Sequence, residues 1–250
     1  MWISLFEEPV LKIRVFLFVC LCLILVLINA VAQESINSSP NEETKISGIE
    51  TLFPAKPGFR WRYLRETGEG TSHYATDFLG SLTKNEKKYQ ILGNPYGTSY
   101  YEITPDMLVL RGIAPADDIK KVDFYEDGGL IRIKKPVKKG NKWEGKATLK
   151  RENEIIITSY RSEILGWSKV NVPVGSFDSL VTSSTLNTVF IKTEDGFGKG
   201  AVTMEQIWYA PRVGIVRRTI YLMYPGRPLV MLRDDKLEEF IRERRENTGE

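Results

Sequence analysis

Segments with a two-residue period fill the chain from residue 51 to about residue 233. In Phe59-Arg60-Trp61-Arg62-Tyr63, aromatic residues alternate with arginines, so the rings share one face of a strand and the guanidinium groups the other. Similar alternating or β-branched segments cover residues 96–104, 107–113, 129–133, 143–150, 155–165, 179–192, 201–209 and 214–224. This succession of short strands limits the fold more than any other feature of the sequence.

Short turn sequences separate the strands. Asp127-Gly128-Gly129, Lys139-Gly140-Asn141 and Asp195-Gly196-Phe197-Gly198 supply residues that tolerate positive φ, as tight hairpin turns require. Many strands joined by short turns, without helices between them, predict a mainly β domain over residues 51–233. We expect an antiparallel, strongly curved open sheet or half-barrel.

Only the last segment, residues 234–250, has a helical pattern. Asp234 and Asp235 suit a helix N-terminus, and a narrow apolar stripe follows at helical spacing. The stripe consists of Leu237, Phe240 and Ile241. The sequence therefore predicts a short, charged C-terminal helix, with a frayed tail as the alternative.

An uncharged apolar run covers residues 15–32. Lys12 and Arg14 precede it and Ala30-Val31-Ala32 closes it, which is the arrangement of a secretory signal peptide over residues 1–32. Because such a run is just long enough to span a bilayer, an uncleaved membrane anchor is the alternative. In both cases the basic flank directs the rest of the chain across the membrane. We therefore predict an exported protein, periplasmic or extracellular.

Residues 33–50 are rich in Ser, Asn, Glu and Pro, and they are predicted to form a disordered linker. Both cysteines, Cys20 and Cys22, lie in the apolar run, so a cleaved chain has no thiol. The one histidine, His73, with Asp77 nearby in sequence, lacks the motifs that accompany a catalytic triad. Chemistry that needs paired thiols, paired histidines or a Cys–His dyad is therefore excluded for the cleaved chain.

Carboxylates are the remaining candidates for catalysis. Asp117-Asp118 and Asp234-Asp235 are adjacent pairs, whereas a glycosidase needs two carboxyl groups facing each other across a cleft. The sequence contains no calcium-loop pattern, and its glycine-rich segment precedes a strand rather than a helix. We expect no cofactor, no metal and no enzymatic activity. A carboxylate-dependent hydrolase acting on polysaccharide is the alternative.

The charge of the chain is mild, with 35 Lys and Arg against 32 Asp and Glu. Nucleic-acid binders show a stronger and more clustered excess, so we expect no nucleic acid as partner. One group of lysines surrounds a predicted turn and can contact anionic lipid or a polyanionic polymer, or simply be solvated. It consists of Lys134, Lys135, Lys138, Lys139 and Lys142.

The pattern P-x-x-x-G-x-x-W occurs twice, at residues 54–61 and 136–143. In each copy, the proline and glycine are predicted to shape a turn and the tryptophan to begin the next strand, where its ring can seal one end of a core. A duplicated half-sheet and one turn used twice are both compatible with this repeat.

With two further motifs, V-P-V-G-S-F at residues 172–177 and W-Y-A-P-R-V-G at residues 208–214, the chain resembles a family of uncharacterised bacterial exported proteins and lipoproteins, called TapB-like. The resemblance covers residues 53–218. It implies an extracytoplasmic β-rich domain like the half-barrels of envelope lipoprotein carriers, and it supplies no catalytic residues. Its fold-signature residues are Gly58, Trp61, Gly140, Trp143, Pro173, Gly175, Phe177, Trp208, Tyr209, Pro211 and Gly214.

These observations together predict an exported, non-enzymatic envelope protein. Aromatic and aliphatic residues at alternating positions would line the concave face of a half-barrel. We therefore expect the curved sheet to bind an apolar, lipid-like ligand or to dock an envelope partner. A structural component of a surface assembly is a further alternative.

Overall fold

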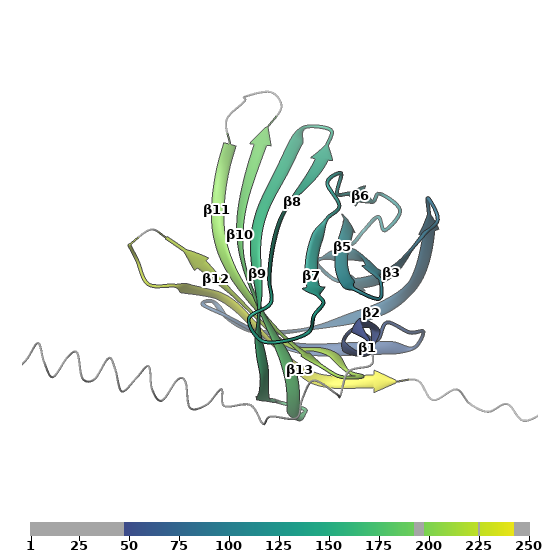
Figure 1. Cartoon of the computed structure of the whole chain (residues 1–250), viewed down its shortest axis with the longest axis vertical. Helices are drawn as coiled ribbons and strands as arrows, with labels where there is room; N and C mark the ends of the chain where they lie inside the picture. The colour runs from purple at the N-terminus through teal and green to yellow at the C-terminus, as the bar shows by residue number, and fades with distance from the viewer. Residues whose placement is uncertain (1–47, 193–197, 225, 243–250) are drawn as a thin grey trace, which may run out of the picture. The chain divides into compact units, whose positions relative to one another are not determined.

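The structure is a computed structural model that describes residues 48–192, 198–224 and 226–242 (Figure 1). The predicted signal peptide or anchor, residues 33–47 of the predicted linker, most of the predicted turn at residues 195–198 and the end of the predicted C-terminal helix lie outside these ranges. Within them, no helix has both the length and the apolar character needed to cross a membrane.

In the described ranges, thirteen strands form one sheet in which every pairing is antiparallel, as the sequence predicts. Their bounds are β1 Phe59–Thr67, β2 Gly70–Lys84, β3 Lys87–Asn94, β4 Gly97–Ile103, β5 Met107–Ala114, β6 Asp123–Phe124, β7 Leu130–Lys134, β8 Lys142–Arg151, β9 Glu154–Val172, β10 Gly175–Lys192, β11 Gly198–Ala210, β12 Gly214–Met223 and β13 Val230–Arg242. The mainly β, antiparallel class is confirmed.

The strand order is β6-β5-β4-β3-β2-β1-β13-β12-β11-β10-β9-β8, and β7 pairs with β5. The pairing of β1 with β13 joins the two halves of the chain. The sheet then curls until its ends approach each other, where the Glu126 N–H donates to the Thr148 carbonyl at 2.9 Å. The Trp143 indole on β8 also donates to the Ile131 carbonyl on β7, at 3.1 Å. The sheet is therefore nearly closed and barrel-like (Figure 1).

A four-residue helix, α2 (Ile49–Leu52), precedes the first strand. Ile49 and Leu52 are fully buried, and with Phe53 they pack into the main apolar cluster against residues such as Ile133. Burying these large side chains favours an ordered segment, because each contributes roughly 1.5–3 kcal/mol when removed from water. The folded domain therefore starts before residue 51, inside the predicted linker.

The predicted C-terminal helix is wrong, because residues 234–242 belong to strand β13. The pairing of β13 with β1 shifts between Arg62 and Tyr63, which leaves Glu238 as an extra residue in the strand. This bulge lets Leu237 and Phe240, three positions apart, pack into the same apolar cluster. A bulged strand can thus imitate helical spacing.

Cross-strand ion pairs explain why so charged a segment forms a strand. Lys236 Nζ on β13 lies 2.7 Å from Glu66 Oε2 on β1, and Arg62 Nε lies 3.1 Å from Glu238 Oε2. Opposite charges at neighbouring positions of two paired strands, as in these two contacts, stabilise the pairing of the strands. The acids and bases of β13 are therefore matched to those of its neighbours, and not to each other along a helix.

The two copies of P-x-x-x-G-x-x-W adopt similar conformations. Gly58 and Gly140 have φ of 77° and 82°, a backbone region that favours glycine. The tryptophans that follow, Trp61 on β1 and Trp143 on β8, are both buried, and each donates its indole N–H to a backbone carbonyl. The same turn is thus used twice, each time to anchor a tryptophan at the start of a strand.

Candidate functional site

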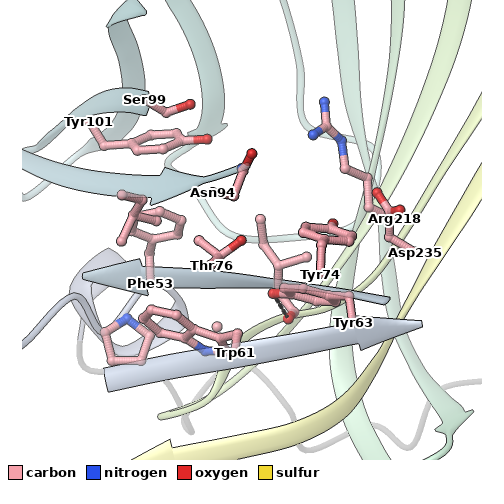
Figure 2. A pocket seen from close by; sticks show the side chains of 14 residues that line it. Phe53, Trp61, Tyr63, Tyr74, Thr76, Asn94, Ser99, Tyr101, Arg218 and Asp235 are labelled. Carbon is pink, nitrogen blue, oxygen red and sulfur yellow. Dashed lines mark hydrogen bonds between the residues drawn. The ribbon is translucent and has the colours of Figure 1, made fainter. Parts of the chain in front are cut away.

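A pocket of about 90 Å³ opens between β1–β4 on one side and β12–β13 on the other (Figure 2). Its aromatic and apolar lining comes from Phe53, Pro54, Trp61, Tyr63, Tyr74, Leu92, Tyr101, Gly214 and Ile215. Its polar lining adds Thr76, Asn94, Ser99, Arg218 and Asp235. The pocket therefore combines a ring-rich surface with several groups that can hydrogen-bond a ligand.

The aromatic floor of the pocket is held by hydrogen bonds to the chain that follows β11. The Trp61 indole N–H donates to the Val213 carbonyl at 2.6 Å, and the Tyr63 hydroxyl donates to the Ile215 carbonyl at 2.8 Å. Phe240 of β13 stacks on Trp61 with ring centroids 5.6 Å apart. Since these polar groups already have partners, the floor offers a ligand its ring surfaces only.

Gly214 completes the floor at the start of β12. Its φ of 97° is one that other residues rarely adopt, and a Cβ atom there would lie 3.5 Å from Pro54 Cδ and 3.6 Å from Trp61 Nε1. Two fold-signature motifs, around Trp61 and Gly214, thus meet beneath the pocket although they are far apart in sequence.

Four hydroxyl groups face the pocket without a hydrogen-bond partner in the described part of the chain; they belong to Tyr74, Thr76, Ser99 and Tyr101. Figure 2 shows Ser99 and Tyr101 on one side of the space and Arg218 with Asp235 on the other. Burial, aided by the nearby Asp235 carboxylate, raises the pKa of Tyr74 to about 12. Its phenol therefore stays protonated at neutral pH and can donate a hydrogen bond.

Arg218 belongs to an ion triplet on the inner face of the sheet, in which Glu205 and Arg132 are buried and Arg218 is half-buried. Glu205 on β11 lies between Arg132 of β7, at 2.5 Å, and Arg218 of β12, whose Nε donates to it. Burial by itself would raise the pKa of Glu205, but the two guanidinium groups outweigh it and lower this pKa to about 2. Burial likewise opposes the charge on Arg218, yet Glu205 raises its pKa overall. All three groups are charged at neutral pH.

A second charged group surrounds Asp235 on β13. Arg65 Nε on β1 lies 2.7 Å from Asp235 Oδ1, and the Arg65 guanidinium sits 4.4 Å and 4.2 Å from the ring centroids of Tyr74 and Tyr96. Arg233 Nε lies 3.5 Å from Asp235 Oδ2, but it makes no hydrogen bond within the described residues. Burial, and then the nearby Arg218 and Arg65, lower the pKa of Arg233.

An excess of positive charge lies next to the pocket, whose own lining includes one arginine, Arg218, and one carboxylate, Asp235. Four arginines share two carboxylates, those of Glu205 and Asp235. The arginines are Arg65, Arg132, Arg218 and Arg233. A buried cation without a matching anion is costly, so an anion in the pocket beside Arg218 would stabilise this cluster.

The two acidic pairs that the sequence offers as catalytic candidates lie in different parts of the fold. Asp234 is buried and pairs with Arg217 at 2.7 Å, while Asp235 pairs with Arg65. Asp117 and Asp118 are exposed in the connection between β5 and β6. No group of three or more acidic, histidine or cysteine side chains suited to a metal occurs among the described residues.

His73 and Asp77 both lie on β2, outside the pocket. His73 Nδ1 is 2.9 Å from Glu238 Oε2, and Asp77 Oδ1 is 3.5 Å from Arg60 Nε. The side chains of His73 and Asp77 are both exposed by 40% or more. Each therefore contacts a different partner at the surface, and the two side chains do not form a shared constellation.

Among the other fold-signature residues, Tyr209 is buried in the main core and Phe177 packs on the cluster that contains Trp61. Trp208 is half-buried, with Arg217 over its ring at 5.1 Å. Pro173 and Gly175 form the exposed turn between β9 and β10, and Pro211 lies in the turn after β11. The five lysines are exposed around the β7–β8 connection, away from the pocket lining: Lys134, Lys135, Lys138, Lys139 and Lys142.

Sequence reasoning did not select Arg65, Arg132, Glu205 or Arg218. A signal for some of them was present: Arg132 stands within Leu130-Ile131-Arg132-Ile133, a charge inside an apolar strand. A charge at such a position is exposed if it points outward and needs a partner if it points inward. The register of the strand decides whether the side chain points outward or inward, and this register cannot be derived from the local sequence.

No protein-family model matches the sequence, and a search of curated proteins gives no match. A solved structure described as a lipoprotein of Parabacteroides distasonis is 15% identical, with a TM-score of 0.49 over 76% of this chain and 98% of that one. An exported protein with a YmcC-like fold from Bacteroides fragilis is 11% identical, with a TM-score of 0.37 over 75% and 97%.

The lipoprotein YmcC of Escherichia coli is also 11% identical, with a TM-score of 0.33 over 74% of this chain and 85% of that one. TM-scores below 0.5 are too low to carry an assignment of fold or function. The TapB-like resemblance therefore stays a prediction.

Proposed function

We propose that this chain is an exported, non-enzymatic binding protein of the cell envelope, and that the pocket beside Arg218 holds a small polar ligand with an anionic group. The observation that carries the proposal is that four hydroxyls without a partner in the described structure share one cavity with Arg218, which belongs to a cluster of four arginines and two carboxylates. Hydroxyl and guanidinium groups donate hydrogen bonds, and charge-assisted bonds to an anion are the strongest of these. Export itself rests on the apolar run at residues 15–32.

The size of the pocket favours a small ligand. Pockets that bury a drug-sized molecule measure roughly 300–1,000 Å³, whereas this one measures about 90 Å³. A complete lipid is too large for it, and the polar lining suits an acyl chain poorly. A single ring or head group fits better, with one face on Trp61 and Tyr63 and its anionic part toward Arg218.

The state of the buried acids supports binding rather than hydrolysis. Among the described residues four carboxylates are buried, those of Glu102, Glu205, Asp234 and Asp235, and each pairs with an arginine. A glycosidase needs one carboxylic acid that is still protonated near neutral pH. Glu205, with its lowered pKa, is the opposite of such an acid.

Calorimetric titration with matched pairs of small molecules tests the proposal. Benzoate is compared with benzamide, and glucuronate with glucose, since each pair differs in the anionic group. We expect at least one anion to bind and its neutral match to bind more weakly by about tenfold or more, which corresponds to one charge-assisted hydrogen bond of ~1.5–3 kcal/mol.

Two variants locate the binding. Tyr101→Phe and Ser99→Ala remove hydroxyls that have no partner in the described structure, so they should weaken binding roughly three- to tenfold without loss of stability. Ser81→Ala, exposed elsewhere on β2, is the matched control. Binding that neither Tyr101→Phe nor Ser99→Ala weakens would place the ligand outside the pocket. If none of the four probes binds, the proposed function is contradicted.

A further inference from the structure

The end of the β12–β13 hairpin is apolar and exposed. Its side chains retain between 41% and 49% of their accessible surface. They are Tyr224, Leu229, Val230, Met231 and Leu232. In Figure 1 this end of the hairpin lies at the left, and β12 is paired with β11 as far as Met223. Contiguous exposed apolar residues mark a surface that contacts a partner.

The strand register places apolar side chains on both faces of this hairpin. Tyr221 pairs with Met231, and the neighbouring Leu222 pairs with Val230. Because consecutive residues point to opposite faces, one pair lies on each face. The pairing of β13 with β1 stops at Asp234, so the outer edge of residues 230–233 is unpaired within the described structure, while β12 on their other side is paired with β11 as far as Met223.

The charge of the hairpin end is one-sided. From Ile220 to Arg233 the sequence contains no Asp or Glu, while Arg227 lies in the turn. Tyr221 and Tyr224 add aromatic rings with a polar tip. Apolar side chains with tyrosines and arginine, and without acids, are the combination that suits the interface of a membrane with anionic lipids.

We infer that the β12–β13 hairpin end inserts into the surface of a lipid bilayer that contains anionic lipids. A groove on a protein covers one face of the hairpin end, whereas a bilayer surface surrounds both faces, as the apolar side chains on opposite faces require. Pairing with the edge of a second copy would leave these two faces exposed. This inference is independent of the ligand pocket, which lies on other residues.

Vesicle sedimentation tests whether the β12–β13 hairpin end binds a bilayer. The protein used consists of residues 33–250, so that the predicted export segment does not contribute to vesicle binding. Vesicles of phosphatidylcholine with phosphatidylglycerol are compared with phosphatidylcholine alone. We expect binding to the mixed vesicles and weaker binding to the neutral ones. The double variant Leu229→Ser, Met231→Ser should lower the bound fraction at least about tenfold, since it removes two apolar side chains from the inserted surface.

Matched control variants distinguish insertion of the hairpin end from vesicle binding by other parts of the surface. Val174→Ser with Phe190→Ser removes exposed apolar side chains elsewhere and should change nothing. Arg227→Glu keeps the apolar surface and should reduce binding to mixed vesicles more than to neutral ones. Lack of binding to any vesicle overturns the inference. Equal losses in the control, or a dimer in light scattering that the Leu229→Ser, Met231→Ser variant dissociates, overturn it as well.

Discussion

Asp235 on the last strand accepts two hydrogen bonds from Arg65 on the first, at 2.7 and 3.4 Å, across 170 positions of sequence. Both side chains are nearly fully buried. The pair lies where β1 meets β13, which is the contact that joins the two halves of the sheet. The same carboxylate lines the pocket, so the closure of the sheet and the charge of the site depend on one residue.

Replacing Asp235 with Asn is expected to destabilise the domain strongly. Removing one partner of a buried ion pair costs about 3–5 kcal/mol, because the remaining charge stays buried; here Arg65 and Arg233 both lose their anion. Urea unfolding measures the change. Asp77→Asn, which breaks an exposed pair with Arg60, is the control and should cost no more than about 1 kcal/mol. Equal losses in the two variants would contradict this role of Asp235.

The ion pairs of Glu205 are expected to make the folding stability of the domain depend on pH. Its pKa is about 2 in the folded state, below the ordinary value of 4.5. Its contribution is therefore present above about pH 5 and is lost as the pH falls through the folded pKa toward 2, by about 3 kcal/mol in total. Denaturant unfolding from pH 6 to pH 2.5 should show part of this loss. Glu205→Gln should be less stable at pH 6 and lack this acid dependence; an unchanged slope would contradict the assignment.

Trp61 and Trp143 are expected to contribute similar amounts to the stability of the domain. Phenylalanine at either position keeps a ring and removes the indole N–H, so a buried carbonyl loses its donor at a cost of about 1–3 kcal/mol. Trp208, half-buried and without such a bond in the described structure, is the control for the same substitution. Thermal unfolding of the three variants should rank Trp208→Phe as the most stable. A different order would show that the paired indole bonds are unimportant.

Gly214→Ala should destabilise the domain by about 1–2 kcal/mol, because alanine rarely adopts the φ of 97° found there. The new methyl group would also contact Pro54 and Trp61 in the pocket floor. Gly68→Ala lies in a turn with nothing near its Cβ and should stay within about 0.5 kcal/mol of the parent. Chemical denaturation of both variants checks the difference, and a neutral Gly214→Ala would refute the strain at this position.

Most strands could be predicted because one of their faces is buried. In β1 and β4, apolar residues alternate with polar ones, and the alternation matches the buried and exposed positions. The bounds of strand β2 were not predicted, because all of its residues are exposed or half-buried and its sequence carries little period. It is held by pairing with β1 and β3, which no local pattern reports.

The aromatic residues of the candidate site could be predicted from the sequence, whereas the charged residues could not. Trp61 and Gly214 stand in recognisable motifs, and both line the pocket. Asp235 was noticed, but its helical interpretation failed because the bulge at Glu238 changes the period of β13. Arg218 and Glu205 become inward-facing through the registers of β11 and β12, which depend on contacts distant in sequence.

The most direct test of the central claim is a crystal structure of residues 33–250 with the tightest-binding anion of the calorimetric panel. The account predicts the anionic group within hydrogen-bond distance of Arg218, and a second polar contact from at least one of the free hydroxyls, those of Tyr74, Thr76, Ser99 and Tyr101. An anion bound on another surface, with the pocket beside Arg218 unchanged, would contradict the claim.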